Sequence, residues 1–351
     1  MKALTYYGSN GHGRGDFRVE DVPEPQVTPG TVLLDVDWCG ICGSDLHEYE
    51  TDTASGYATP VILGHEFAGT VSAIGSGVTN VKVGQRVTVE PFMYCMECED
   101  CRKNEYHLCQ KLGVVGVHSI GGGFAEKSVV PAYTVHALPD SVSTETAALT
   151  EPLAVGWHAM RKANFQAGQT ALVLGAGPIG LTTLLCARAF GAGLTIVSVR
   201  RPGARHDAAK RLHADVVLDS SLTDVVAQVM ELTNGRGVDA VFETTGSQEA
   251  LDIAMAAVRN GGVIASLAVW VKPPTFDFMQ VLLKEPTIVG SKGYNDQDFP
   301  EVIAAMGDGR ISDADLIVST KIGLGEVITA GFDMLEKERS SHVKVLVTPG
   351  I

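Results

Sequence analysis

The chain has 351 residues, of which 45% are hydrophobic and 19% are charged, and its formal net charge at pH 7 is -14. This length exceeds the size at which one hydrophobic core usually stops growing, so the sequence predicts two compact domains without extended disorder. The negative charge excludes nucleic acid and anionic membranes as expected partners, because phosphates would be repelled. The chain has no 18-residue apolar run, and the opening MKALTYYGSN lacks the apolar stretch of a secretory signal. We therefore expect a cytoplasmic protein with no membrane partner.

The first 150 residues predict a small β-rich domain. The segments TVLLDVDWC, EFAGTVSAIG and GQRVTVE are short β-type runs between glycine-rich turns, with little helical periodicity. After residue 290 the sequence predicts helices at 298–307 and 326–338, followed by the strand HVKVLV. These last elements do not extend the pattern of the middle of the chain, so we expect them to return to the first domain.

Three separate segments contain candidate ligands for a catalytic metal ion. CGICGSDLHEYE, GHEFAG and EPLAVGWHA together supply Cys42, Ser44, Asp45, His47, His65, Glu66 and Glu151. One thiolate, one imidazole and one carboxylate can hold zinc and leave its fourth position for water or an alcohol oxygen. Each residue alone is more often structural than catalytic, but their combination predicts an open zinc site.

Four of the seven cysteines lie within fifteen positions, at Cys95, Cys98, Cys101 and Cys109. In a reducing compartment such a cluster more often binds metal than forms disulfides. The spacing lets four thiolates surround one tetrahedral zinc ion, which predicts a closed structural site in a lobe at 93–112. A zinc ribbon that binds nucleic acid is the alternative, and the acidic residues Glu97, Glu99 and Asp100 disfavour it. A redox CxxC pair is disfavoured as well.

From Gly168 onward, short apolar runs alternate with amphipathic helical stretches. The strand-like runs include TALVLGAG, LTIVSV, DVVLDS, VDAVFETTG and GVIASLAVW. Such alternation predicts a parallel sheet covered by helices on both faces and joined by right-handed crossovers. The sequence therefore predicts a doubly wound α/β domain.

The motif GAGPIG joins the first of these strands to a helix. Gly175 allows the tight turn, Gly177 lets the backbone approach a pyrophosphate, and Gly180 permits close packing of helix on strand. The amide groups at the helix N-terminus would bind the phosphates, so Pro178 and Ile179 complete the predicted dinucleotide site. A glycine-rich turn without a ligand is the alternative.

The end of the second strand, SVRRPGAR, indicates which cofactor is bound. An acidic residue there would accept hydrogen bonds from the adenosine ribose of NAD, but this chain has Val199, followed by Arg200 and Arg201. Guanidinium groups bind a 2′-phosphate in bidentate fashion, which favours NADP(H) over NAD(H). Ser198 and Arg205 are further candidate contacts. Alternatively, the arginines form only a solvated surface turn.

Taken together, these motifs resemble the zinc-dependent medium-chain dehydrogenase/reductase family. Within it, EPLAVGWHA and AVWVKPP are most similar to the 2,3-butanediol dehydrogenase branch, with sorbitol dehydrogenases and ketose reductases as neighbours. The resemblance implies an α/β protein with a GroES-like catalytic domain from both chain ends, 1–153 and 291–351. A Rossmann cofactor-binding domain at 154–290 would lie between them in the sequence. The resemblance also suggests that the protein is a homodimer or homotetramer.

The resemblance assigns roles to individual residues. It makes Cys42 and His65 catalytic zinc ligands and leaves the third ligand open between Glu66 and Glu151. It matches Ser44 and His47 to the hydroxyl and imidazole of a proton relay.

Three further positions follow from the resemblance. Lys344 matches a basic residue that reaches the cofactor pyrophosphate. Cys39 and Cys186 do not match ligand positions, so we expect them to pack in the core.

The expected activity is hydride transfer between NADP(H) and a small secondary alcohol or vicinal diol, of the 2,3-butanediol/acetoin type. An NADP-dependent polyol dehydrogenase or ketose reductase is the alternative, and a non-catalytic NADPH-binding protein is a third. Two zinc ions per chain are expected, one catalytic and one structural. The segment HEYETDTASGYATPVILGHE borders the expected substrate pocket and is shorter than the resemblance to butanediol enzymes leads us to expect.

Overall fold

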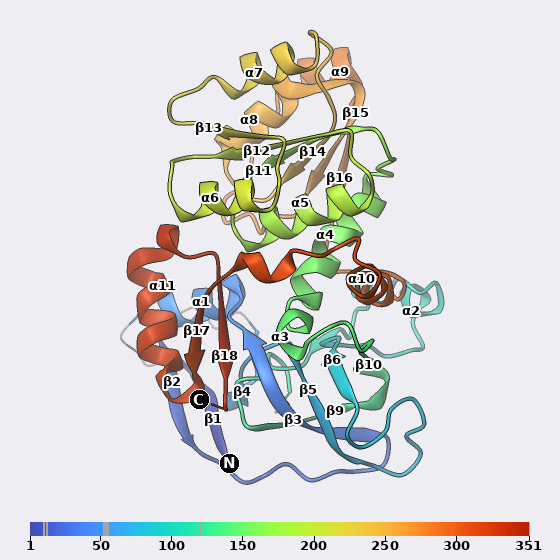
Figure 1. Cartoon of the computed structure of the whole chain (residues 1–351), viewed down its shortest axis with the longest axis vertical. Coiled ribbons are helices and arrows are strands. Elements are labelled where there is room, and N and C mark those ends of the chain that lie inside the picture. The colour runs from blue at the N-terminus through green and yellow to red at the C-terminus, as the bar shows by residue number, and fades with distance from the viewer. Residues whose placement is uncertain (10, 12, 52–55, 120, 351) are drawn as a thin grey trace. The chain divides into compact units, whose positions relative to one another are not determined.

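The computed structural model describes residues 1–9, 11, 13–51, 56–119 and 121–350, so 52–55 of the segment bordering the expected substrate pocket lie outside it. The described chain divides into two compact units (Figure 1). The first comprises Met1–Glu151, Asn295–Gly307 and Val318–Ile351, and the second comprises Pro152–Tyr294 and Asp308–Ile317. The sequence analysis assigned 308–317 to the first domain. It groups with the second because Ala314 and Ile317 are buried in a short helix that packs on α5 (Pro178–Ala189) and α6 (Ala204–Arg211).

The first unit is built mainly from β-strands. Its large sheet has the order β10 (Val135–Ala137), β6 (Arg86–Val89), β5 (Glu66–Ile74), β3 (Thr31–Gly40), β18 (Lys344–Thr348) and β17 (Val318–Gly323), with β9 (Lys127–Pro131) also paired to β3. A smaller sheet has the order β2 (Gly15–Asp21), β1 (Lys2–Ser9) and β4 (Val61–Ile62). A third pairs β7 (Phe92–Met93) with β8 (Gly113–Val114). The final strand therefore lies beside β3, which joins the two ends of the chain in one sheet.

Short helices connect these strands. They are α1 (Gly43–Glu50), α2 (Glu99–Arg102), η1 (Tyr106–Leu108), η2 (Ala132–Thr134), α3 (Thr144–Ala147), α10 (Asp298–Gly307), η4 (Leu324–Glu326), η5 (Val327–Phe332), α11 (Asp333–Glu338) and η6 (Arg339–Ser341). Helix α4 (Thr150–Lys162) begins in the first unit and continues into the second.

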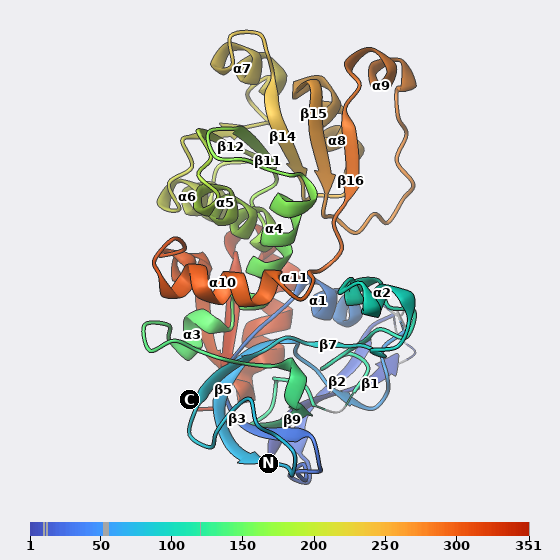
Figure 2. The ribbon, with the colours of Figure 1, turned by 90° about the vertical axis from the view of Figure 1, so that its right-hand side faces the viewer.

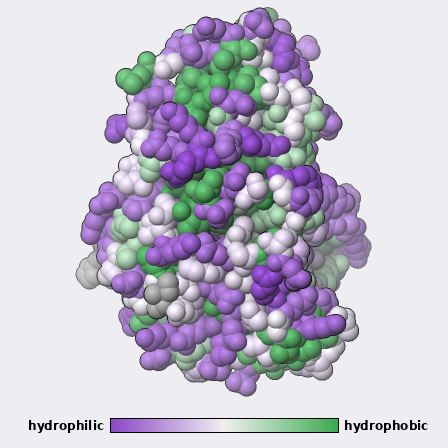
Figure 3. All heavy atoms as spheres, in the orientation of Figure 1, coloured by the Kyte–Doolittle hydropathy of each residue, from purple (hydrophilic) through white to green (hydrophobic). Residues whose placement is uncertain are grey.

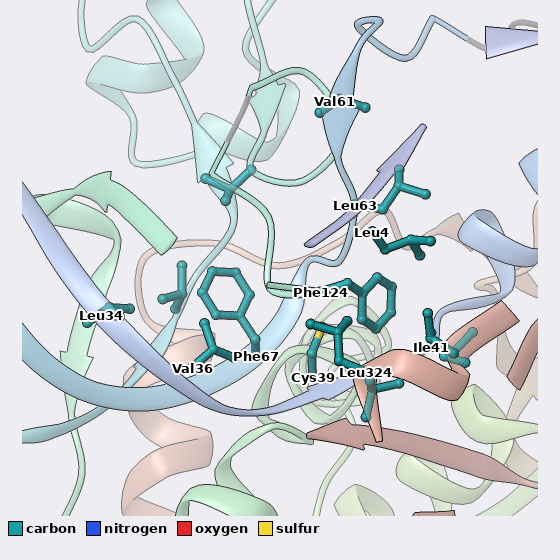
Figure 4. Packing of buried hydrophobic residues seen from close by; sticks show 14 of the residues in the cluster. Leu4, Leu34, Val36, Cys39, Ile41, Val61, Leu63, Phe67, Phe124 and Leu324 are labelled. Carbon is teal, nitrogen blue, oxygen red and sulfur yellow. The ribbon is translucent and has the colours of Figure 1, made fainter. Parts of the chain in front are cut away.

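An apolar cluster packs between the strands of the first unit. Leu34, Leu63 and Phe124 have no exposed surface, and the Cys39 side chain lies with them close to Phe124 and Leu324 (Figure 4). Burial raises the pKa of the Cys39 thiol well above its ordinary value, which keeps the thiol protonated within the apolar cluster. Cys39 is thus a packing residue.

The second unit is a doubly wound parallel sheet. Its strand order is β13 (Val216–Asp219), β12 (Leu194–Val199), β11 (Thr170–Leu174), β14 (Val238–Glu243), β15 (Val258–Ser266) and β16 (Thr287–Gly290). The helices are α5 (Pro178–Ala189), α6 (Ala204–Arg211), α7 (Val225–Leu232), α8 (Gln248–Ala257), α9 (Phe278–Lys284) and η3 (Ala314–Ile317). The order reverses between β11 and β14, and ligands of such sheets bind at that switch point.

The strands of this sheet are apolar because helices cover both of its faces. All six residues of β14 are buried, and α7 and α8 share a core cluster with β11, β14 and β15. Cys186 on α5 is fully buried, and its thiol donates to the Leu153 carbonyl at 3.4 Å, so it is also a packing residue.

The face of the molecule drawn in Figure 3 is mostly polar. Hydrophilic side chains cover most of it, and hydrophobic ones appear there in separate patches (Figure 3). None of the helices among the described residues combines the length and the apolar character needed to cross a membrane.

Candidate metal centres and cofactor site

The pairing of β3 with β5 assembles the first metal cluster. Gly40 at the end of β3 pairs with Glu66 at the start of β5, so Cys42 comes close to His65 and Glu66. One ligand atom of each of these three residues lies within 4.8 Å of the others. A Cβ at position 40 would collide with Glu66 Oε2 and with the Lys344 side chain, which explains the glycine in CGIC.

The chemistry of this cluster suits zinc. His65 and Glu66 are buried, and sulfur, nitrogen and oxygen donors together form the set that zinc prefers. Burial lowers the pKa of His65, but the nearby Asp45 carboxylate and Cys42 thiol outweigh this effect and raise it well above its ordinary value. The negative charge of the residues around His65 favours a bound cation.

Asp45 orients the ligands of the cluster. Its Oδ2 accepts the backbone N–H of Cys42 at 3.1 Å, and its Oδ1 lies 3.6 Å from His65 Nδ1. Directed toward Asp45, Nδ1 leaves the opposite ring nitrogen of His65 for metal. The sequence analysis named Asp45 without giving it a role. The available signal was its place at the third position of a helix capped by Cys42, where a side chain returns to the cap.

Lys344 is buried against the same cluster. Its ammonium forms an ion pair with Glu66 and donates to the Ile41 carbonyl at 3.0 Å. The pairing of β18 with β3 places it there, since Leu346 lies opposite Gly40. No sequence pattern indicates this position beside Glu66, and contact with the cofactor pyrophosphate stays a prediction.

Glu151 lies near the cluster but outside the closely spaced group. Its charge contributes to raising the pKa of His65 and of Lys344. The residues whose ligand atoms meet within 4.8 Å are Cys42, His65 and Glu66. Of the two carboxylates that the resemblance left open, the geometry therefore brings Glu66 to the other ligands.

Ser44 and His47 lie together on helix α1. They are three positions apart, which places them on one face of the helix, and both are exposed. Ser44 is two residues from the ligand Cys42. The proton relay through these two side chains stays a prediction.

The four clustered cysteines form the second metal site. Their sulfur atoms all lie within 4.8 Å of one another, and the Cys95 sulfur is 3.8 Å from that of Cys101 and 3.6 Å from that of Cys109. A tetrahedral zinc ion with bonds of about 2.3 Å requires sulfur atoms about 3.8 Å apart, whereas a disulfide requires about 2.05 Å. Backbone N–H groups of Glu97 and Cys98 lower the pKa of Cys95 to about 6, whereas burial raises the pKa of Cys101 to about 12. It is therefore the spacing of the four sulfur atoms that supports a closed zinc site.

The glycine turn of the second unit has the geometry that dinucleotide binding needs. Gly175 has φ +102°, and a Cβ there would lie 2.7 Å from Thr245 Cγ2. A Cβ at Gly180 would collide with the Gly175 carbonyl, so α5 can approach β11 only with glycine at this position. Gly177 caps α5 and Pro178 follows it, which leaves the first amide groups of the helix available for phosphate.

The end of β12 presents several arginines. Ser198 and Val199 are buried, whereas Arg200 and Arg201 are exposed. Arg205, in the first turn of α6, extends over the glycine turn, with Nη1 4.0 Å from where a Cβ of Gly177 would be. Arg205 thus brings positive charge to the glycine turn, and Val199 occupies the position where many dinucleotide folds have a carboxylate.

This combination of fold and sites defines a zinc-binding dehydrogenase. Residues 28–140 match the Alcohol dehydrogenase GroES-like domain family, and residues 178–308 match the Zinc-binding dehydrogenase family. The chain belongs to this family of alcohol dehydrogenase-type oxidoreductases, which confirms the predicted fold class of a GroES-like domain with a Rossmann domain.

Its relatives include enzymes that act on diols. The chain is 38% identical to "(R,R)-butanediol dehydrogenase" of Neisseria gonorrhoeae over 100% of both chains. It is 40% identical to "Sorbitol dehydrogenase" of Bacillus subtilis over 72% of each. The crystal structure of 2R,3R-butanediol dehydrogenase from Bacillus subtilis matches with a TM-score of 0.89 and 38% identity, covering 99% of both chains. A putative zinc-binding dehydrogenase from Sinorhizobium meliloti bound to NADP matches with a TM-score of 0.89 and 30% identity, also covering 99% of both.

We predict that the purified protein binds two zinc ions per chain. Cys42→Ala should reduce the content to about one, because the remaining donors of the first cluster bind zinc too weakly to retain it. Cys39→Ala, which alters a nearby buried thiol outside the cluster, should retain two. Elemental analysis after exhaustive dialysis measures this. A wild-type protein with only one zinc ion would contradict the prediction.

Asp45→Asn should weaken zinc binding at the first cluster by about 10- to 100-fold, because the substitution removes the charge that orients His65. Competition with a chromophoric chelator measures the affinity, and the four-cysteine site in the same protein serves as an internal reference. Asp35→Asn, which removes a surface partner of Lys127, is the matched control and should change neither site. An unchanged affinity in Asp45→Asn would contradict the assigned role.

Proposed function

We propose that this protein transfers hydride between NADP(H) and a small secondary alcohol or vicinal diol, as in the interconversion of 2,3-butanediol and acetoin. The observation that most directly supports this proposal is the cluster of Cys42, His65 and Glu66, with Ser44 and His47 on the adjoining helix. Relatives named butanediol dehydrogenase that match over nearly the whole chain support the substrate class.

In this proposal the residues of the first unit bind the substrate oxygen and move its proton. Zinc held by Cys42, His65 and Glu66 would supply a Lewis acid that lowers the pKa of an alcohol. Ser44 accepts the proton at Oγ, and His47 passes it to solvent, which its exposure permits. In the reduction direction the same two side chains deliver the proton.

Two further residues affect the charge and the geometry of the cluster. The Lys344 ammonium offsets the charge of Glu66, so the cluster can hold a carboxylate in a buried position. Asp45 holds the imidazole of His65 in one orientation. The choice of Glu66 over Glu151 as the third zinc ligand belongs to the proposal and is supported by the spacing of the ligand atoms.

The four-cysteine site has a structural role in this proposal. Four protein ligands complete the coordination of zinc and leave no position for a substrate. The ion would hold the lobe of α2 and η1, which has few apolar residues of its own.

The glycine turn and the arginines of the second unit bind the cofactor in this proposal. The amide groups at the start of α5 contact the pyrophosphate, and Arg200, Arg201 and Arg205 bind the 2′-phosphate of NADP(H), with Ser198 contributing a hydroxyl. Val199 supports this choice because it cannot accept hydrogen bonds from a ribose. The similar structure from Sinorhizobium meliloti is bound to NADP, which supports the choice, whereas another similar structure, of rspB from Escherichia coli, is complexed with NADH.

An initial-rate matrix tests the proposal. NAD and NADP are crossed with acetoin, 2,3-butanediol, sorbitol, xylitol and simple secondary alcohols, and the series is repeated after zinc removal. We expect the highest kcat/KM with NADP(H) and the acetoin/butanediol pair, and loss of activity without zinc. Preference for sorbitol or xylitol would favour the polyol alternative, which the sorbitol dehydrogenase relative supports. No turnover on any substrate would favour a non-catalytic NADPH-binding protein.

Arg200→Ala and Arg201→Ala should each lower kcat/KM for NADP by about 10-fold or more and leave that for NAD nearly unchanged, because only the 2′-phosphate loses a charged hydrogen bond. Arg211→Ala, at the opposite end of α6 and also exposed, is the control. A wild-type enzyme that prefers NAD would contradict the cofactor assignment.

We also propose that the protein is a homodimer that forms along strand β16. This strand lies at the edge of the parallel sheet (Figure 2), and its unpaired backbone groups can bond to a second copy. Large apolar side chains concentrate in the same stretch of chain, namely Val269 (90% exposed), Val271 (86%), Phe278 (76%), Met279 (59%), Leu282 (68%), Leu283 (71%) and Ile288 (40%). Exposed apolar surface of this kind marks an interface. The proposed location is the cytoplasm, where its thiols stay reduced.

The double variant Leu282→Asp/Leu283→Asp should be monomeric, because two carboxylates would be buried in the dimer. Analytical ultracentrifugation measures the mass. Val83→Asp, which changes an apolar residue that is 61% exposed in the first unit, is the control and should remain dimeric. A monomeric wild-type protein would contradict the proposed assembly, and a tetramer with an unaffected double variant would contradict the proposed edge.

A further inference from the structure

A buried carboxylate, that of Glu243, lies at the base of the turn 244–247 that follows strand β14, here named the β14 turn. Glu243 is fully buried, and glutamate is seldom buried in this way without an ionic partner. Its Oε1 accepts the Thr245 backbone N–H at 2.7 Å, the Thr245 hydroxyl at 2.6 Å and the Gly246 backbone N–H at 2.9 Å. Its Oε2 is shielded from solvent and forms no hydrogen bond with any group of the described residues. Within the described chain, the hydrogen bonds of this carboxylate thus all go to the β14 turn.

The β14 turn packs directly on the glycine turn of the cofactor site. The Thr244 hydroxyl donates to the Leu174 carbonyl at 2.7 Å, one residue before Gly175. A Cβ at Gly175 would lie 2.8 Å from Thr244 Oγ1 and 2.7 Å from Thr245 Cγ2. The position of the glycine turn therefore depends on where these two threonines are held, and Glu243 holds Thr245.

The two turns border the crevice in which sheets of this kind bind their ligands. Strands β11 and β14 are parallel neighbours between which the strand order reverses, and Leu174 lies opposite Glu243 in their register. Dinucleotides bind outside the carboxyl ends of such strands, at the switch point. The glycine turn follows β11 and the β14 turn follows β14, so both lie at this edge of the sheet.

We infer that Glu243 is a positioning residue for cofactor binding, whose carboxylate fixes the β14 turn against the glycine turn. The inference rests on the proposed function and concerns the cofactor end of the same site. Turns that already have their bound shape lose less conformational entropy when a ligand binds. Without the carboxylate, two N–H groups and one hydroxyl would lose their acceptor, and the β14 turn would be free to move away from Gly175.

Asp239, on the same strand, offers a matched comparison. It lies at the opposite end of β14, is also buried, and accepts the Thr170 backbone N–H at 2.9 Å and the Thr170 hydroxyl at 2.8 Å. It also pairs with Arg236 at 2.8 Å and with Arg259 at 2.7 Å. A similar carboxylate therefore stabilises the sheet at the edge opposite the glycine turn.

The test measures the dissociation constants of NADPH and NADH for the zinc-loaded protein by fluorescence titration without substrate. Glu243→Ala should weaken binding of the cofactor that the wild-type protein prefers by about 10-fold or more, because three donors lose their partner. Glu243→Gln keeps an acceptor oxygen without the charge and should recover part of this loss, to within about fivefold of wild type. Asp239→Asn should lower the melting temperature and leave both dissociation constants within about twofold of wild type.

Hydrogen exchange of the cofactor-free proteins gives a second readout that does not depend on activity or on the choice of cofactor. Residues 174–180 should exchange faster in Glu243→Ala than in Asp239→Asn or the wild-type protein, because the β14 turn no longer holds the glycine turn.

Unchanged dissociation constants in Glu243→Ala, or an equal loss of affinity in Asp239→Asn, would overturn the inference and leave the proposed function intact. Should Glu243→Ala fail to fold, wild-type affinity and exchange in Glu243→Gln would overturn it instead. A wild-type protein that binds neither cofactor would contradict the proposed function, and the exchange comparison would still decide whether Glu243 holds the glycine turn.

Discussion

The pairing of β3 with β5 and β18 is the constraint on which the first metal cluster depends. These strands bring together residues from three distant parts of the chain, namely Cys42, His65 with Glu66, and Lys344. The contact is possible because position 40 has no side chain. A slip of one residue in this register would turn every side chain of a strand to the opposite face and separate the ligands. Sheet packing and metal binding therefore constrain the same backbone.

Charge is the second constraint on the cluster. Asp45 and Glu66 are acidic and buried, and burying such groups is costly unless positive charge compensates them. Lys344 supplies a permanent positive charge, and the donor set suits a zinc ion for the remainder. A zinc ion and the Lys344 ammonium would thus together compensate the negative charge that is buried in the first unit.

Sequence reasoning succeeded where the signal is local. The alternating strands and helices are encoded in short spacings, the four cysteines that the spacing groups lie together, and the helix expected at 298–307 has those bounds in the structure. Asp45 and Lys344 were not assigned their roles because these depend on strand pairing between distant segments. Residues 308–317 were also not placed in the second unit from the sequence, because this placement depends on the packing of η3 against α5 and α6.

The placement of Asp308–Ile317 bears on how the protein could be divided. This segment belongs to the cofactor-binding unit, although the chain on either side of it belongs to the other unit. A truncated fragment ending at residue 294 would therefore lack η3 and would leave apolar surface of α5 and α6 open to water. Swapping the cofactor-binding unit between homologous enzymes would require grafting two separate pieces of chain, Pro152–Tyr294 and Asp308–Ile317. A chimera that exchanges only the first piece would pair α5 and α6 with an η3 from the other enzyme.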